Sequence, residues 1–210
     1  MDLYCERAAP GLFEEPFNTF TNIVFLIAAW RAWVTGRDLN ALTTGTRLLI
    51  ALLVCIGIGS TLFHSFATEW ASLMDVAPIL LFQLCYLWLY VRNLMGRGIG
   101  AALGLTTIFL VTVYFTQPFR NVLNGSLLYA PALILLGCLG LYHFQSKKRG
   151  RHLLITAMGL LIISLFFRTI DRVVCSDLPV GTHFIWHLLN GIVLYLVVNA
   201  LLLNIKNSSQ

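Results

Sequence analysis

Apolar residues gather into seven long runs along this chain, and short polar stretches separate the runs. Each run has roughly the 20 residues that an α-helix needs to cross the hydrocarbon core of a bilayer. We therefore predict an all-α, polytopic membrane protein whose single domain, residues 1–210, is a bundle of seven transmembrane helices. The predicted spans are roughly 18–35, 46–64, 73–92, 98–116, 122–144, 152–170 and 183–204.

Composition and charge agree with a membrane-embedded chain. Of its 210 residues, 58% are hydrophobic and 11% are charged, whereas soluble domains carry about 25% charged residues. With seven spans, most Lys and Arg residues lie in loops on the side of the C-terminus, and the positive-inside rule places that side in the cytosol. The acidic N-terminal segment then lies outside the cell or in a lumen. The net charge of +5 follows from this topology and does not indicate nucleic-acid binding.

The cysteines separate into two groups by position. Cys55, Cys85 and Cys138 lie inside predicted spans, where a buried, apolar thiol is the ordinary interpretation. Cys5 and Cys175 both lie on the predicted non-cytosolic side. An oxidising compartment would permit a disulfide between them, which would tie the N-terminal segment to the loop before the last span. The sequence does not distinguish a bacterial inner membrane from the membrane of the ER or Golgi.

Polar and ionisable residues interrupt three spans, all at their predicted outer ends. In "GIGSTLFHS", Ser60 and His64 are four residues apart; Asp75 lies near the start of the next span; His183 and His187 are again four apart. Residues at i and i+4 lie on one face of a helix. Ionisable side chains inside membranes are costly and usually mark a functional site. We expect these five side chains to converge on one point.

Each of these residues also has a structural interpretation when it is taken alone. Ser60 could bond back to its own helix, Asp75 could cap a helix, and His64 could be an interfacial, hydrogen-bonded histidine. Together, three neutral histidines with an open position are typical of catalytic zinc, which lowers the pKa of bound water. A carboxylate can then relay a proton, and a hydroxyl can donate to an oxyanion. The pattern predicts a zinc hydrolase, and the absence of HExxH argues against a zincin peptidase.

This order of residues resembles the alkaline ceramidase family. That family belongs to a superfamily of seven-span membrane hydrolases that also includes the adiponectin and progestin receptors. Three further matches favour the ceramidase branch: "YCE" at 4–6, "EPFNTFTN" at 15–22 and "GIGSTLFH" at 57–64. The matching motifs extend over essentially the whole chain.

The resemblance implies a role for each member of the polar cluster. His64, His183 and His187 would bind zinc, Asp75 would be the acid/base group beside the metal-bound water, and Ser60 would stabilise the tetrahedral oxyanion. The reaction would be hydrolysis of the ceramide amide to sphingosine and a fatty acid. The substrate rests on the resemblance alone, whereas zinc hydrolysis also follows from the residues themselves.

The resemblance further implies a calcium site in the acidic N-terminal segment. Asp2, Glu6 and Glu15 are the candidate ligands. The sequence departs from the family pattern at Ala8, where an Asn is typical, and at Leu3, where the family has an Asp. Calcium prefers six to eight oxygen ligands, so each lost oxygen weakens the prediction. The alternative is an acidic, solvated outer segment.

Three other functions stay open. The substrate could be another N-acyl lipid or a lipid ester, because pockets for acyl chains are lined by interchangeable apolar residues. The protein could also be a seven-span receptor with a structural zinc ion. A rhomboid-like serine protease would use Ser60 as its nucleophile, but "GIGST" lacks the Gly that rhomboid signatures place after the Ser.

The remaining polar residues are predicted to be structural. We expect Arg168, Asp171 and Arg172, in "FFRTIDRVV", to form an interfacial ion pair and anchors whose charged ends reach the membrane surface. His143 and His152 flank the basic loop on the predicted cytosolic side. Both are therefore excluded from the metal site.

Overall fold

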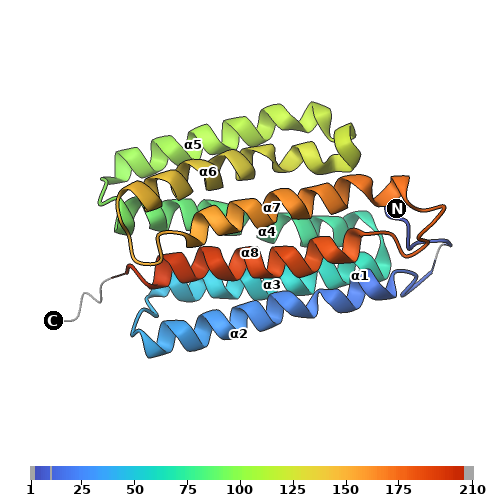
Figure 1. Cartoon of the computed structure of the whole chain (residues 1–210), viewed down its shortest axis with the longest axis horizontal. Helices are drawn as coiled ribbons and strands as arrows, with labels where there is room; N and C mark the ends of the chain where they lie inside the picture. Colours follow the sequence, from blue (N-terminus) through green and yellow to red (C-terminus); the bar gives the residue numbers. More distant parts are fainter. Residues whose placement is uncertain (1–2, 10, 206–210) are drawn as a thin grey trace.

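Helices running roughly along one common axis make up the computed structural model of the protein, which describes residues 3–9 and 11–205 (Figure 1). The described residues contain no β-strand. In chain order, the α-helices are α1 (Pro16–Thr21), α2 (Ile23–Asp38), α3 (Thr44–Phe66), α4 (Glu69–Leu89), α5 (Ile99–Thr116), α6 (Ala130–Gln145), α7 (Leu153–Ile170) and α8 (His183–Leu202). Short 3₁₀ segments precede α6 and follow α7, and a π-helical turn extends α4 to Leu94.

Six helical segments among the described residues are long and apolar enough to cross a membrane. The chain is therefore an integral membrane protein by the length and composition of its helices. The six segments are Thr44–Phe66, Glu69–Leu94, Ile99–Phe119, Val122–Gln145, Leu153–Val173 and His183–Leu202. They correspond to the second to seventh predicted spans.

The first predicted span consists of two shorter helices, α1 of 6 residues and α2 of 16 residues. The helix is interrupted at Asn22, whose side-chain amide donates to the carbonyl of Asn18, while its own carbonyl accepts from Phe25. Asn side chains compete with the helical hydrogen-bond pattern in this way. In Figure 1, α1 and α2 follow one another along the bundle beside α3, and the first described residues and the end of α8 lie at opposite ends of it. The seven-span count and the orientation stay predictions.

The centre of the bundle is formed by α3 and α8. In each, 56% of the most apolar stretch is buried, compared with 11% for α5, so α5 leaves most of its surface exposed on the outside of the bundle. At the end of α3 where the polar residues gather, Gly59 lies directly against the backbone of α4. A Cβ at Gly59 would collide with the carbonyl oxygen of Met74. This close approach brings the polar end of α3 beside the first turns of α4.

Candidate metal centre

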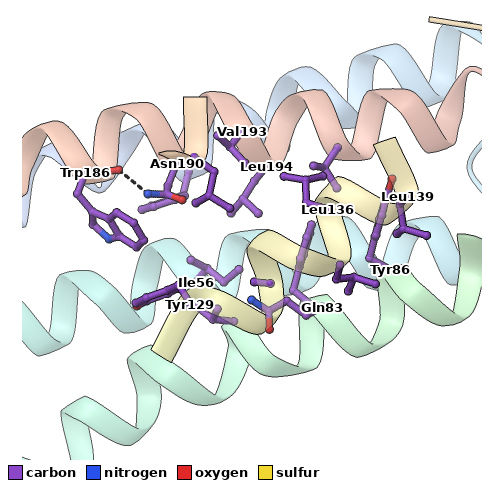
Figure 2. A pocket seen from close by; sticks show the side chains of 17 residues that line it. Ile56, Gln83, Tyr86, Tyr129, Leu136, Leu139, Trp186, Asn190, Val193 and Leu194 are labelled. Atoms are coloured by element: carbon purple, nitrogen blue, oxygen red, sulfur yellow. Dashed lines mark hydrogen bonds between the residues drawn. The ribbon is translucent and has the colours of Figure 1, made fainter. Parts of the chain in front are cut away.

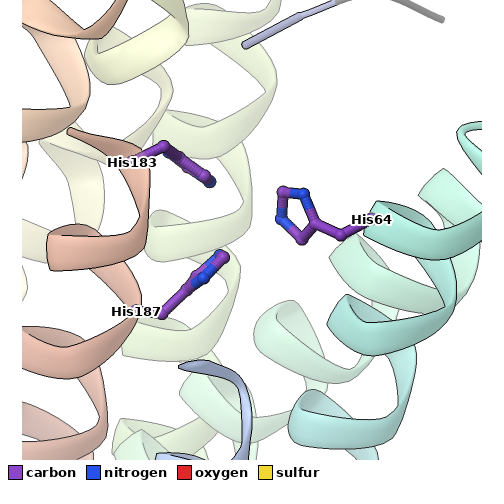
Figure 3. Close-up of side chains that lie close together, drawn as sticks. All are labelled: His64, His183 and His187. Carbon is purple, nitrogen blue, oxygen red and sulfur yellow. The ribbon is translucent and has the colours of Figure 1, made fainter. Parts of the chain in front are cut away.

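Three buried histidines meet between the ends of α3 and α8. His64 lies in the last turn of α3, and His183 and His187 occupy the first two turns of α8. Figure 3 shows the three imidazoles pointing toward one another, and one nitrogen from each lies within 4.8 Å of the others. Each side chain is at most 2% exposed. Among the described residues, this is the one group of three or more His, Cys, Asp or Glu side chains close enough to hold a metal ion.

Two of the imidazoles are oriented by hydrogen bonds through Nδ1. The Nδ1 of His64 lies 2.6 Å from Oε2 of Glu15, and the Nδ1 of His187 lies 3.0 Å from the Thr21 hydroxyl. The Thr21 hydroxyl itself donates to the carbonyl of Phe17, so its oxygen is left to accept from His187. Both rings therefore keep Nε2 free as a ligand, and such partners are usual for metal-binding histidines.

The third imidazole carries an unsatisfied buried nitrogen. Nδ1 of His183 is buried and has no hydrogen-bond partner in the described chain. Buried polar atoms are normally paired, and a metal ion shared with His64 and His187 would satisfy this one. The three imidazole donors, in a closed and oriented cluster, fit zinc.

Glu15, which orients His64, is itself held by several donors. Its carboxylate is 2% exposed and accepts from Nε of Arg7 at 2.7 Å and from the amide of Asn18 at 3.1 Å. Burial alone would raise the pKa of Glu15, but the hydrogen bonds and charges of its partners outweigh burial and hold that pKa below its usual value. The side chain is thus an anion paired with a buried cation.

Asp75 and Ser60 lie at the same end of the bundle as the histidines. The carboxyl of Asp75 lies near the Ser60 hydroxyl, the ring of His64 and the guanidinium of Arg168. Ser60 is 4% exposed and lies one helical turn before His64. A carboxyl group and a hydroxyl therefore flank the histidine cluster on its α4 side.

A segment before α1 covers the histidine cluster. The ring of Tyr4 stacks on His183 with 3.7 Å between centroids, and its hydroxyl accepts from Arg168 at 3.0 Å. Burial raises the pKa of Tyr4 to about 12, although Arg168 opposes the shift, so Tyr4 stays a neutral phenol. The predicted disulfide between Cys5 and Cys175 is present and fixes this segment to the loop before α8.

The predicted interfacial ion pair between Asp171 and Arg168 or Arg172 is wrong, and so is the prediction that Arg168 is a membrane anchor. Asp171 is fully buried and forms no pair with either arginine; it accepts the backbone N–H groups of Cys5, Thr182 and His183 at 3.1, 2.6 and 2.9 Å. It thereby caps the N-terminus of α8, where a carboxylate is favoured. Arg168 turns inward and lies over the ring of Tyr4 as well as those of Tyr129 and Trp186.

The candidate calcium ligands are already engaged by protein donors. The carboxylate of Glu6 accepts the backbone N–H groups of Phe17 and Asn18 at 2.6 and 2.9 Å, and so caps α1. Glu15 is paired with Arg7, and Asp2 lies outside the described residues. This arrangement does not fit a calcium ion, which requires several oxygens turned toward one point.

A cavity of about 110 Å³ lies next to the histidine cluster, between the helices and further toward the middle of the bundle. Its α8 wall begins at Trp186, the residue before His187 in the sequence, and continues at Asn190 and Val193 (Figure 2). Val197, further along α8, also lines it. The opposite walls come from α4 and α6, and most of the lining side chains are apolar. Such a cavity suits a hydrocarbon chain.

His143, which the sequence excluded from the metal site, lies away from the histidine cluster. It is fully buried and forms hydrogen bonds with the Tyr90 hydroxyl and the carbonyl of Arg149.

Comparison with known proteins relates the chain to one described family. The sequence model of the family described as Ceramidase matches residues 4–209, which is nearly the whole chain and includes the histidine cluster and the segment that covers it. Among curated proteins, none matches the chain.

Proposed function

Because the chain belongs to the ceramidase family, we propose that it is a zinc-dependent amidohydrolase that cleaves the amide bond of ceramide to sphingosine and a fatty acid. The observation that carries the zinc requirement is the cluster of three buried histidines with ligand nitrogens within 4.8 Å of one another. The identity of the substrate rests on the family. The cavity beside the cluster agrees with a substrate that brings a long hydrocarbon chain.

His64, His183 and His187 would hold the zinc ion. When it is bound, zinc supplies an activated water and polarises the carbonyl of the amide. The chain supports these ligands from outside: Glu15 and Thr21 orient two of the rings, while Asp171 and Tyr4 fix the backbone and the ring of His183. A site held from so many directions loses little free energy to reorganisation during the reaction.

Asp75 and Ser60 would carry out the proton transfer and the charge stabilisation. Asp75 takes the proton from the attacking water and returns it to the amide nitrogen as the C–N bond breaks, so that sphingosine leaves as a neutral amine. Ser60 donates its hydroxyl hydrogen to the oxygen that becomes negative when the carbonyl carbon turns tetrahedral. The proximity of their side chains supports this division of roles.

The cavity would hold the acyl chain of the substrate. Trp186 lines the cavity and its ring lies 6.4 Å from that of His183, so an amide near the cluster can extend its hydrocarbon chain toward Val193 and Val197. Both hydrocarbon chains of a ceramide then remain in an apolar environment while the amide reaches the polar residues. With α1 and α2 together as the first of seven spans, and with the positive-inside orientation, this site faces the non-cytosolic side.

The test is to purify the protein in mild detergent and to measure bound metal and ceramide turnover together. We expect about one zinc per chain in the wild type, none in His183→Ala or His187→Ala, and full zinc in the control His143→Ala. Asp75→Asn should keep its zinc and lose activity by a factor of about 10² to 10⁴.

The outcomes separate this proposal from its rivals. A folded wild type without zinc refutes the mechanism. Zinc without turnover of ceramide, but with turnover of another N-acyl lipid or of a lipid ester, keeps the mechanism and changes the substrate. Zinc without hydrolysis of any lipid favours a receptor in which the metal is structural.

A further inference from the structure

Arg7 is the only basic residue among the first 17 residues, in a segment that is otherwise acidic. It is 8% exposed, although a lone arginine in an N-terminal segment would be expected to extend into water. A buried cation must be paired or fully hydrogen-bonded. Its partners therefore indicate why the chain keeps a charge at this position.

The guanidinium of Arg7 is surrounded by oxygens from three parts of the chain. Nε donates to Oε1 of Glu15 at 2.7 Å, one terminal nitrogen donates to the carbonyl of Gly11 at 3.1 Å, and the other donates to the carbonyl of His64 at 3.1 Å. The planar fork of an arginine is suited to hold several acceptors in fixed directions. Here it joins the N-terminal segment, the start of α1 and the end of α3.

The contact with Glu15 connects Arg7 to the histidine cluster. One carboxylate oxygen of Glu15 accepts from Arg7, and the other accepts from Nδ1 of His64 at 2.6 Å. Without its cation, Glu15 would be a buried, unpaired charge, and burial of such a charge is strongly unfavourable. Arg7 therefore allows a carboxylate to stay beside His64, where it fixes the orientation of the imidazole.

We infer that Arg7 is a positioning residue of the metal site, and that its guanidinium provides the positive charge for which a calcium ion would otherwise be needed. The inference rests on the proposed role of His64 as a zinc ligand. Two further features of the segment agree with it: Glu6 uses its carboxylate to cap α1, and Ala8 offers no ligand oxygen. A divalent cation beside Arg7 would also meet a like charge at short range.

The first measurement compares the zinc affinity of full-length variants in detergent, by competition with a chelator of known affinity. Loss of a residue that orients a ligand typically weakens metal binding 10- to 100-fold, and we expect a loss in this range for Arg7→Ala. Arg7→Lys should lose less, because lysine keeps the charge but not the three-way contact. The control is Arg172→Ala, at an exposed arginine on the same predicted side, which should bind zinc as the wild type does.

The second measurement follows the melting temperature of the zinc-loaded wild type in calcium-free buffer, after addition of millimolar Ca²⁺ or, as a control for ionic strength, Mg²⁺. We expect the two ions to act alike. A stabilisation specific to Ca²⁺ would overturn the inference, and so would an Arg7→Ala variant with the zinc affinity of the wild type. If Arg7→Ala does not fold, Arg7→Lys carries the same comparison. A folded wild type that binds no zinc would instead refute the proposed function on which the inference rests.

Discussion

Replacing Val193 by phenylalanine tests whether the cavity beside the histidines holds the acyl chain. Val193 is 4% exposed, lines the cavity, and lies six residues beyond His187, or about 9 Å along the axis of α8. The larger side chain would enter the cavity and displace about three methylene groups of a bound chain, each worth about 0.8 kcal/mol. Long-chain ceramides should therefore lose about 2.4 kcal/mol, or roughly 50-fold in kcat/KM.

The assay is kcat/KM for a series of ceramides with acyl chains of increasing length. Short chains, which end before Val193, should be hydrolysed as well by Val193→Phe as by the wild type, and the loss should begin at a defined length. Ile192→Phe is the matched control, since Ile192 is the neighbouring residue on the same helix and is 46% exposed. An equal loss at every chain length, or no loss at any length, would refute the assignment of the cavity.

Three further predictions concern the supports of the site. Gly59→Ala should lower both stability and turnover, because its Cβ would push α3 away from α4. The control Gly159→Ala, whose Cβ would enter open space, should leave both unchanged. Stability is measured by thermal denaturation and turnover by the ceramide assay. Cys175→Ser removes the disulfide, which links residues 170 positions apart. It should lower the free energy of unfolding by up to about 5 kcal/mol, as measured by denaturant titration of the variant and of the wild type with and without reductant. Asp171→Ala leaves three backbone N–H groups without their acceptor and should cost about 1–3 kcal/mol, whereas the exposed Asp177→Ala should cost little.

The transmembrane helices were largely predictable because the signal is local. A run of about 20 apolar residues satisfies the bilayer by itself, whatever its neighbours in the bundle, and six of the predicted spans are present as helical segments. The first span differs because Asn18 and Asn22 are buried polar residues within it. Their hydrogen bonds interrupt the helix, and the partners of such residues cannot be read from an apolar run.

The histidine cluster was predictable in part for the same reason. The spacing of His183 and His187 fixes both on one face of a helix, and the alternation of spans places His64 at the same end of the bundle. The supports of the cluster were not predictable from local pattern. Asp171 and Cys5 are 166 residues apart in sequence, and a charged residue at the end of a span is most simply interpreted as a membrane anchor. The sequence nevertheless contained a signal for the capping role of Asp171, because this Asp precedes a polar turn and then His183, the first histidine of the last span.

The two central helices, α3 and α8, do not fix the geometry of the metal site by themselves, and the segment before α1 contributes to it. His64 and the histidine pair belong to different helices, so a metal site made by α3 and α8 alone would depend on how those helices rotate against each other. The segment restricts that rotation from both sides: Tyr4 stacks on His183, whereas Arg7 donates to the carbonyl of His64. Between them, Cys5 is fixed covalently to the loop that precedes α8. Three residues of this segment, all outside the predicted spans, thus connect the two halves of the histidine cluster, and a mutation in the segment should change metal binding as well as stability.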